Sequence, residues 1–125
     1  MADIRPFRGL RYSPKAVAPL TNVLCPPYDI ITHTQHEGLQ RVSPYNAVHL
    51  EFPQGDLQRR YARAAQAMGR WQLEGVLERD PQPSYYVVRH RFHHQGQELE
   101  RWGLTACVRL EEFHRQVVLP HEETG

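Results

Sequence analysis

Apolar side chains recur every three or four residues across positions 57–74, a spacing typical of an amphipathic helix. Asp56 stands where it can cap the first turn, and Gly75 can end the helix in a left-handed conformation. Gly69 lies inside the helix, where glycine costs about 1 kcal/mol relative to alanine, so it predicts close packing at that point. The expected apolar face consists of Leu57, Tyr61, Ala64, Ala65, Met68, Trp71 and Gln72.

Apolar and polar residues alternate in three shorter segments, which predicts strands. The first strand is expected at 48–52, followed by strands at 85–92 and 101–110. The last two are separated by a short polar loop in which Gly96 is free to take a positive φ, so they predict a hairpin. An isolated hairpin is marginally stable in water, and we therefore expect further strands, including residues 4–10, to extend the sheet.

These elements predict an α+β fold, in which one long helix packs on a small mixed β-sheet. A chain of 125 residues fits a single domain over 1–125. Seven of its ten prolines fall within the first 53 residues, which favours extended segments and stiff turns there. Residues 116–119 are apolar and could begin another strand, so we expect the fold to be incomplete at the C-terminus.

The charge balance argues against nucleic acid as a partner. Lysine and arginine number 15 and aspartate and glutamate 14, whereas proteins that grip phosphates of nucleic acids usually carry a basic excess. No apolar run is long enough to cross a membrane, and the N-terminus lacks the pattern of a signal peptide. We therefore expect a cytoplasmic protein without a membrane partner.

The closing residues form the most suggestive chemical cluster. His121 and Glu122 could orient or move a proton, and the Thr124 hydroxyl could contact phosphate. Adjacent residues of an extended segment point to opposite sides, so these groups converge only where the backbone turns. The alternative is a frayed, solvated terminus.

A second candidate is the loop Cys25-Pro26-Pro27-Tyr28-Asp29, in which two prolines would hold Tyr28 and Asp29 in a fixed presentation. No histidine is placed by the sequence to activate Cys25, so we interpret its thiol as inert. For Asp29 two interpretations stay open: the residue forms part of a structural turn, or its carboxylate is functional. Arg8 belongs to an N-terminal series of arginines that could bind phosphate or carboxylate, or could be scattered surface charges.

The eight histidines do not predict a metal site. No cysteine pair or matched second cluster completes a set of four ligands, and His90 and His93 would lie on opposite faces of a strand. The common phosphate-binding glycine motifs are absent as well.

Several segments, taken in order, resemble the N-terminal region of the domain-of-unknown-function family 1015 (DUF1015). They are Ile4-Arg5-Pro6-Phe7-Arg8-Gly9-Leu10-Arg11-Tyr12, Pro26-Pro27-Tyr28-Asp29, Ser43-Pro44-Tyr45-Asn46-Ala47-Val48-His49-Leu50, Trp71-Gln72-Leu73-Glu74-Gly75-Val76-Leu77, Tyr85-Tyr86-Val87 and Leu119-Pro120-His121-Glu122-Glu123-Thr124. The resemblance implies that the chain is the N-terminal third of a longer family protein. The family is in turn similar to the ParB/sulfiredoxin-like group, which includes free-serine kinases.

This resemblance implies a ParB-like domain that binds ATP or ADP with Mg²⁺ and transfers a phosphoryl group to a small hydroxylated substrate such as a free amino acid. His121 and Glu122 would then be catalytic. Tyr28, Asp29, Asn46, Thr124 and Arg8 would bind nucleotide or substrate. The alternatives are a non-catalytic ParB-like binding module and an inactive fragment.

Overall fold

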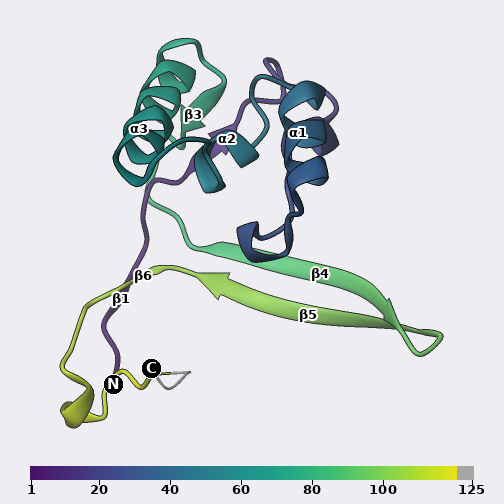
Figure 1. The fold of residues 1–125 in the computed structure, drawn as a ribbon. Helices are drawn as coiled ribbons and strands as arrows, with labels where there is room; N and C mark the ends of the chain where they lie inside the picture. The colour runs from purple at the N-terminus through teal and green to yellow at the C-terminus, as the bar shows by residue number, and fades with distance from the viewer. Residues whose placement is uncertain (121–125) are drawn as a thin grey trace. The chain divides into compact units, whose positions relative to one another are not determined.

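The computed structural model describes residues 1–120, and these divide into two compact units. One unit is Leu10–Arg79, and the other combines Met1–Gly9 with the described residues from Asp80 onward. The α+β class is confirmed, because small antiparallel sheets occur together with a long helix (Figure 1). The strands of residues 1–120 form three two-stranded sheets in place of the expected single mixed sheet.

The helices lie in the Leu10–Arg79 unit. They are α1 (His33–Val42), α2 (Val48–Glu51) and α3 (Leu57–Leu73), with short 3₁₀ turns η1 (Leu20–Val23) and η2 (Tyr28–Ile30) before them. Strand β2 (Leu10–Tyr12) pairs antiparallel with β3 (Leu77–Arg79), so the start and the end of this unit meet in one small sheet.

The helix expected at 57–74 is confirmed as α3, and both predicted ends are correct. The Asp56 side chain accepts a hydrogen bond of 2.9 Å from the Arg59 amide, and Gly75 has a φ of +71° just beyond the last turn. Local chemistry is sufficient to define these ends, because each depends on residues within one turn of it.

The buried face of α3 differs from the predicted one. Its more buried positions are Arg60, Ala64, Ala67 and Trp71, whereas Leu57 and Tyr61 are 58% and 67% exposed. The prediction of close packing at Gly69 is also wrong, because a β-carbon there would meet nothing within 4 Å. Ala64 and Trp71 belong to the predicted face, so that part of the prediction is confirmed, and Trp71 enters the core.

The strand expected at 48–52 is wrong, because the segment forms the single helical turn α2. Five residues of alternating polarity cannot distinguish a strand from a buried helical turn. Here the Asn46 side chain accepts a hydrogen bond of 3.0 Å from the Val48 amide, and the Phe52 amide donates to the Val48 carbonyl at 3.0 Å. These local bonds favour the helical turn over an extended strand.

The core of this unit surrounds Trp71, which is completely buried. It consists of Val17, Val23, Trp71, Val76 and Leu77, with Tyr12, Tyr45, Leu50 and Ala67 packed against it. The Tyr12 and Tyr45 rings lie 6.2 and 5.8 Å from the indole, centroid to centroid. Aromatic packing therefore joins three parts of this unit, which are strand β2, the loop that precedes α2, and helix α3.

The second unit is dominated by a hairpin of β4 (Tyr86–His94) and β5 (Gln97–Thr105), which Figure 1 shows as a long ribbon. Its turn residues Gln95 and Gly96 have φ values of +50° and +77°, the signs of a type I′ turn, so the prediction for Gly96 is confirmed. The short strands β1 (Ile4–Arg5) and β6 (Cys107–Val108), which are distant in the sequence, pair antiparallel in this unit. Residues 116–118 form a bend and Leu119 is irregular, so this segment is not a strand.

Candidate functional site

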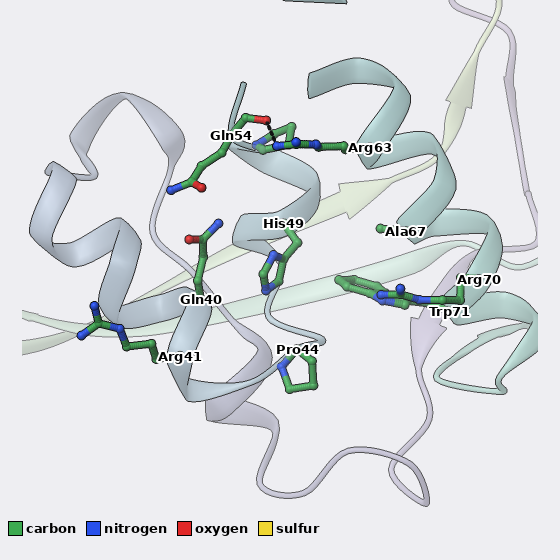
Figure 2. A pocket seen from close by; sticks show the side chains of 10 residues that line it. Gln40, Arg41, Pro44, His49, Gln54, Arg63, Ala67, Arg70 and Trp71 are labelled. Carbon is green, nitrogen blue, oxygen red and sulfur yellow. Dashed lines mark hydrogen bonds between the residues drawn. The ribbon is translucent and has the colours of Figure 1, made fainter. Parts of the chain in front are cut away.

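A pocket of about 430 Å³ opens among the three helices of the Leu10–Arg79 unit. It is lined by Gln40, Arg41, Pro44, His49, Pro53, Gln54, Arg63, Ala67, Arg70 and Trp71. Figure 2 shows Gln40 and Arg41 on α1, His49 on α2, and Arg63, Ala67, Arg70 and Trp71 on α3. The volume lies within the range of small-ligand sites. We call this cavity the three-arginine pocket.

The charge of the three-arginine pocket has one sign. Arg41, Arg63 and Arg70 line it, and among residues 1–120 its lining includes no aspartate or glutamate. Arg41 and Arg70 each approach a carboxylate one helical turn away, at 3.7 Å from Glu37 and from Glu74. These are exposed pairs of small energetic value, so a ligand could replace them at little cost.

Helical geometry places two of these cations together. Arg63 and Arg70 are seven residues apart, close to two turns of α3, and therefore share one side of the helix. Arg63 Nη1 donates a hydrogen bond of 2.9 Å to the Gln54 carbonyl, drawn as a dashed line in Figure 2. Arg41 comes from the last turn of α1, where a cation also interacts favourably with the helix dipole.

His49 and Trp71 form an aromatic wall of the pocket. The two rings meet edge to face, with centroids 6.5 Å apart. His49 Nε2 lies 3.3 Å from the Ser43 carbonyl, and a carbonyl can only accept, so this nitrogen carries the proton. Nδ1 is then the basic atom of the neutral ring.

Two buried donors lack hydrogen-bond partners among residues 1–120. They are Nε1 of Trp71, in the wall of the three-arginine pocket, and Nε of Arg60. Leaving a buried donor unpaired costs about 1–3 kcal/mol, and more for a charged group. Arg60 lines a second cavity of about 330 Å³, and a third of about 440 Å³.

The predicted site residues of the Leu10–Arg79 unit do not line the three-arginine pocket. Tyr28 is 61% exposed, its ring lies 6.3 Å from that of Phe52, and both belong to the third cavity. Asp29 is exposed in the first turn of η2. Proline-rich backbone therefore presents the two side chains at the surface.

Asn46 is fully buried, and its amide is engaged on both sides. Its Nδ2 donates to the carbonyls of Asn22 and Leu24, each at 2.9 Å, while Oδ1 accepts from the Val48 amide. The side chain thus ties the segment after η1 to α2. In this arrangement it supports the helices around the pocket.

Arg8 belongs to the other unit, where its Nε donates a hydrogen bond of 2.6 Å to the Asp80 carbonyl. His121, Glu122 and Thr124, predicted to be catalytic or phosphate-binding, lie outside the described residues.

Within residues 1–120, no group of three His, Cys, Asp or Glu side chains could hold a metal ion. None of the helices described is long and apolar enough to span a membrane.

Two groups near the core have altered acidity. Burial raises the pKa of Tyr12 to about 12, with a smaller contribution from Cys25. Burial also raises the pKa of Cys25, and the charge of Glu51 adds to this shift. A thiol with a raised pKa forms little thiolate at neutral pH, in agreement with its interpretation as inert.

Sequence reasoning missed the residues that form the three-arginine pocket. The spacing of Arg63 and Arg70 was a usable signal, because residues seven apart lie on one side of a helix. Arg41 and His49 had no comparable signal. They reach the pocket only because α1, α2 and α3 pack around one centre.

The chain belongs to the family of proteins of unknown function DUF1015, whose family model matches residues 4–125. The resemblance seen in the sequence is confirmed at this level. No curated protein and no solved structure matches the chain.

Proposed function

We propose that the three-arginine pocket binds the phosphate groups of a small ligand of the nucleotide class, with ATP or ADP as the first candidates. The observation that supports this is that three arginines and no carboxylate line the pocket among the described residues. Planar guanidinium groups bind phosphate through two parallel hydrogen bonds, and several of them match a polyphosphate. The apolar wall of Pro44, Ala67 and Trp71 offers contact to an uncharged part of the ligand.

The lining fits phosphate but not a magnesium ion. Mg²⁺ is usually held through carboxylates, and none lines this pocket among residues 1–120. Asp29, which the resemblance to kinases would assign to Mg²⁺ or substrate, lies in η2, outside the lining. The proposal for the described residues is therefore binding, as in a non-catalytic module.

Phosphoryl transfer to a small hydroxylated substrate such as a free amino acid is the more demanding form of the proposal. It would use ATP with Mg²⁺ and needs His121 and Glu122 at the ligand, with Thr124 near phosphate. This form of the proposal also assumes that the chain is related to the ParB/sulfiredoxin-like group and acts in the cytoplasm. Transfer of radioactive phosphate from ATP to free serine, lost in His121→Ala, would support it.

Calorimetric titration of the 125-residue chain with ATP, ADP, CTP and pyrophosphate, with and without Mg²⁺, tests the binding proposal. We expect saturable binding that weakens steeply with added salt, because each phosphate contact is electrostatic. The double variant Arg63→Gln/Arg70→Gln should weaken binding about a hundredfold or more, because each hydrogen bond from a charged group is worth about 1.5–3 kcal/mol.

Arg59→Gln is the matched control, because Arg59 lies on the same helix, pairs with Asp56 and does not line the pocket. It removes one positive charge without altering the lining. Absence of binding for all four ligands would refute the proposal. Equal weakening by the control and by an Arg63→Gln single variant would show a general charge effect instead of a site.

A further inference from the structure

We infer that the second cavity, around Arg60, is a separate binding site for a small organic acid with one anionic group on an apolar body. It is lined by Ile31, His33, His36, Phe52, Pro53, Gln54, Gly55 and Arg60. We call it the Arg60 pocket. This site is independent of the proposed nucleotide site.

The first argument is the state of Arg60. Its Nε is buried from solvent and has no hydrogen-bond partner within residues 1–120. A buried charged donor without an acceptor is costly, and folded proteins rarely keep one without a reason. A carboxylate or phosphate oxygen in the adjoining cavity is the acceptor that a guanidinium binds best.

The second argument is the charge of the walls. Within the part of the chain that the structure describes, the lining contains Arg60 and two histidines but no aspartate or glutamate. His36 Nε2 lies 2.7 Å from the Phe52 carbonyl, so this ring is already engaged as a donor. His33 is exposed and stands 3.8 Å from Glu37. Among the described residues, Arg60 is therefore the one permanent cation that lines the pocket, which matches a ligand with a single anionic group.

The third argument is the apolar surface beside the cation. Ile31, Phe52 and Pro53 line the cavity, and the Phe52 ring is fixed edge-on by His36, with centroids 5.1 Å apart. Small-ligand sites commonly combine such walls with one or two polar groups that set the orientation. The ligand that fits has an aromatic or branched aliphatic body next to its anionic group.

The Arg60 pocket and the three-arginine pocket share a wall but are lined by different arginines. Pro53 and Gln54 line both cavities, so the segment that joins α2 to α3 forms a wall between them. Arg60 lines the second cavity, while Arg63, one turn later on α3, lines the first. Arg60 can therefore be changed without removing a cation from the three-arginine pocket.

Titration of the ¹⁵N-labelled 125-residue chain with benzoate, benzamide and phenyl phosphate, followed by amide chemical shifts, tests the inference. Benzoate should give saturable shifts at Gly55 and residues 31–36, and benzamide, its uncharged analogue, should bind at least about tenfold more weakly. Tighter binding of phenyl phosphate than of benzoate would assign the site to phosphate esters. Equal binding of benzoate and benzamide, or no saturable shifts with either acid, would overturn the inference.

Arg60→Met removes the charge with little change in volume and should abolish benzoate binding. The same variant should melt at an equal or higher temperature, because it removes an unpaired buried donor, whereas a purely structural arginine would lower the melting temperature when replaced. Arg60→Gln is a second variant with the same expected loss. Arg59→Gln should bind benzoate normally, and retained binding by Arg60→Met would contradict the role of Arg60.

Discussion

The two units of the chain are stabilised in different ways. Every buried apolar side chain among the described residues belongs to the Leu10–Arg79 unit. In the other unit the hairpin strands β4 and β5 are exposed on both faces, with Trp102 at 61% and Leu104 at 59% exposure. Burial of apolar surface is the main favourable term in folding, so the first unit contains most of the stabilisation.

The hairpin unit depends instead on hydrogen bonds and on one tyrosine. The Tyr86 hydroxyl accepts from the Gly9 amide at 2.7 Å and lies 2.5 Å from Asp80 Oδ2, while its ring packs on Phe7 with centroids 5.0 Å apart. A two-stranded hairpin alone is marginal in water. Both proposed sites lie in the unit that has the buried core, where packed helices hold the lining side chains in place.

The largest expected effect comes from Trp71→Ala, which breaks the core of the Leu10–Arg79 unit. Removing a completely buried tryptophan should cost about 3–5 kcal/mol, measured by urea unfolding. Trp102→Ala is the matched control, because Trp102 is exposed. The Arg89 guanidinium carbon Cζ lies over its ring, 5.5 Å from the ring centroid. Its loss should cost about 1 kcal/mol or less. Similar costs for the two variants would contradict the contrast between the units.

Asn46→Ala should be next in size. It leaves the Asn22 and Leu24 carbonyls and the Val48 amide without their partner. Unsatisfied buried groups of this kind should cost about 3 kcal/mol together, measured as a shift of the urea midpoint. Asn46→Asp preserves the acceptor for Val48 but loses both donated bonds, so a stability equal to wild type in that variant would show that the donated bonds are unimportant.

Gly9→Ala tests the hairpin unit. A β-carbon at this position would lie 2.7 Å from the Tyr86 hydroxyl oxygen and 2.9 Å from its ring carbon Cζ. The clash should displace Tyr86 at a cost of about 1–3 kcal/mol and shift the amide signals of β4 and β5. Gly103→Ala is the control, because its nearest neighbour would be the Val88 carbonyl oxygen at an ordinary 4.0 Å. Unchanged β4 and β5 signals in Gly9→Ala would refute the anchoring role of Tyr86.

The smallest effect is a pH dependence of the core unit. Because burial raises the pKa of Tyr12 to about 12, from an ordinary value of 10, the folded state holds this proton more tightly than the unfolded state. The contribution of the protonated Tyr12 to the free energy of unfolding is fully present below about pH 10 and is lost as the pH rises towards 12. Urea unfolding between pH 9 and 12 should show that the free energy of unfolding falls more steeply with pH in wild type than in Tyr12→Phe. Parallel curves would contradict the shift.

Local features of the fold were predictable from the sequence. The helix α3, its Asp56 cap and its end at Gly75 depend on neighbours within a turn, and the turn at Gly96 depends on backbone freedom at one residue. The segment 48–52 was not predictable, because its alternating pattern is too short to exclude a helical turn. The buried face of α3 depends on its partners, and Tyr61 therefore became exposed although its spacing was ideal.

By itself the sequence determined the α+β class, the family and the ends of the long helix, because these depend on short-range patterns and on composition. Helix packing in the folded chain was needed to show that arginines and a histidine from three helices line one pocket, and that the buried Nε of Arg60 has no hydrogen-bond partner among residues 1–120. The physical reason is that helix packing brings together residues distant along the chain. No periodic pattern of polarity records which of them will meet.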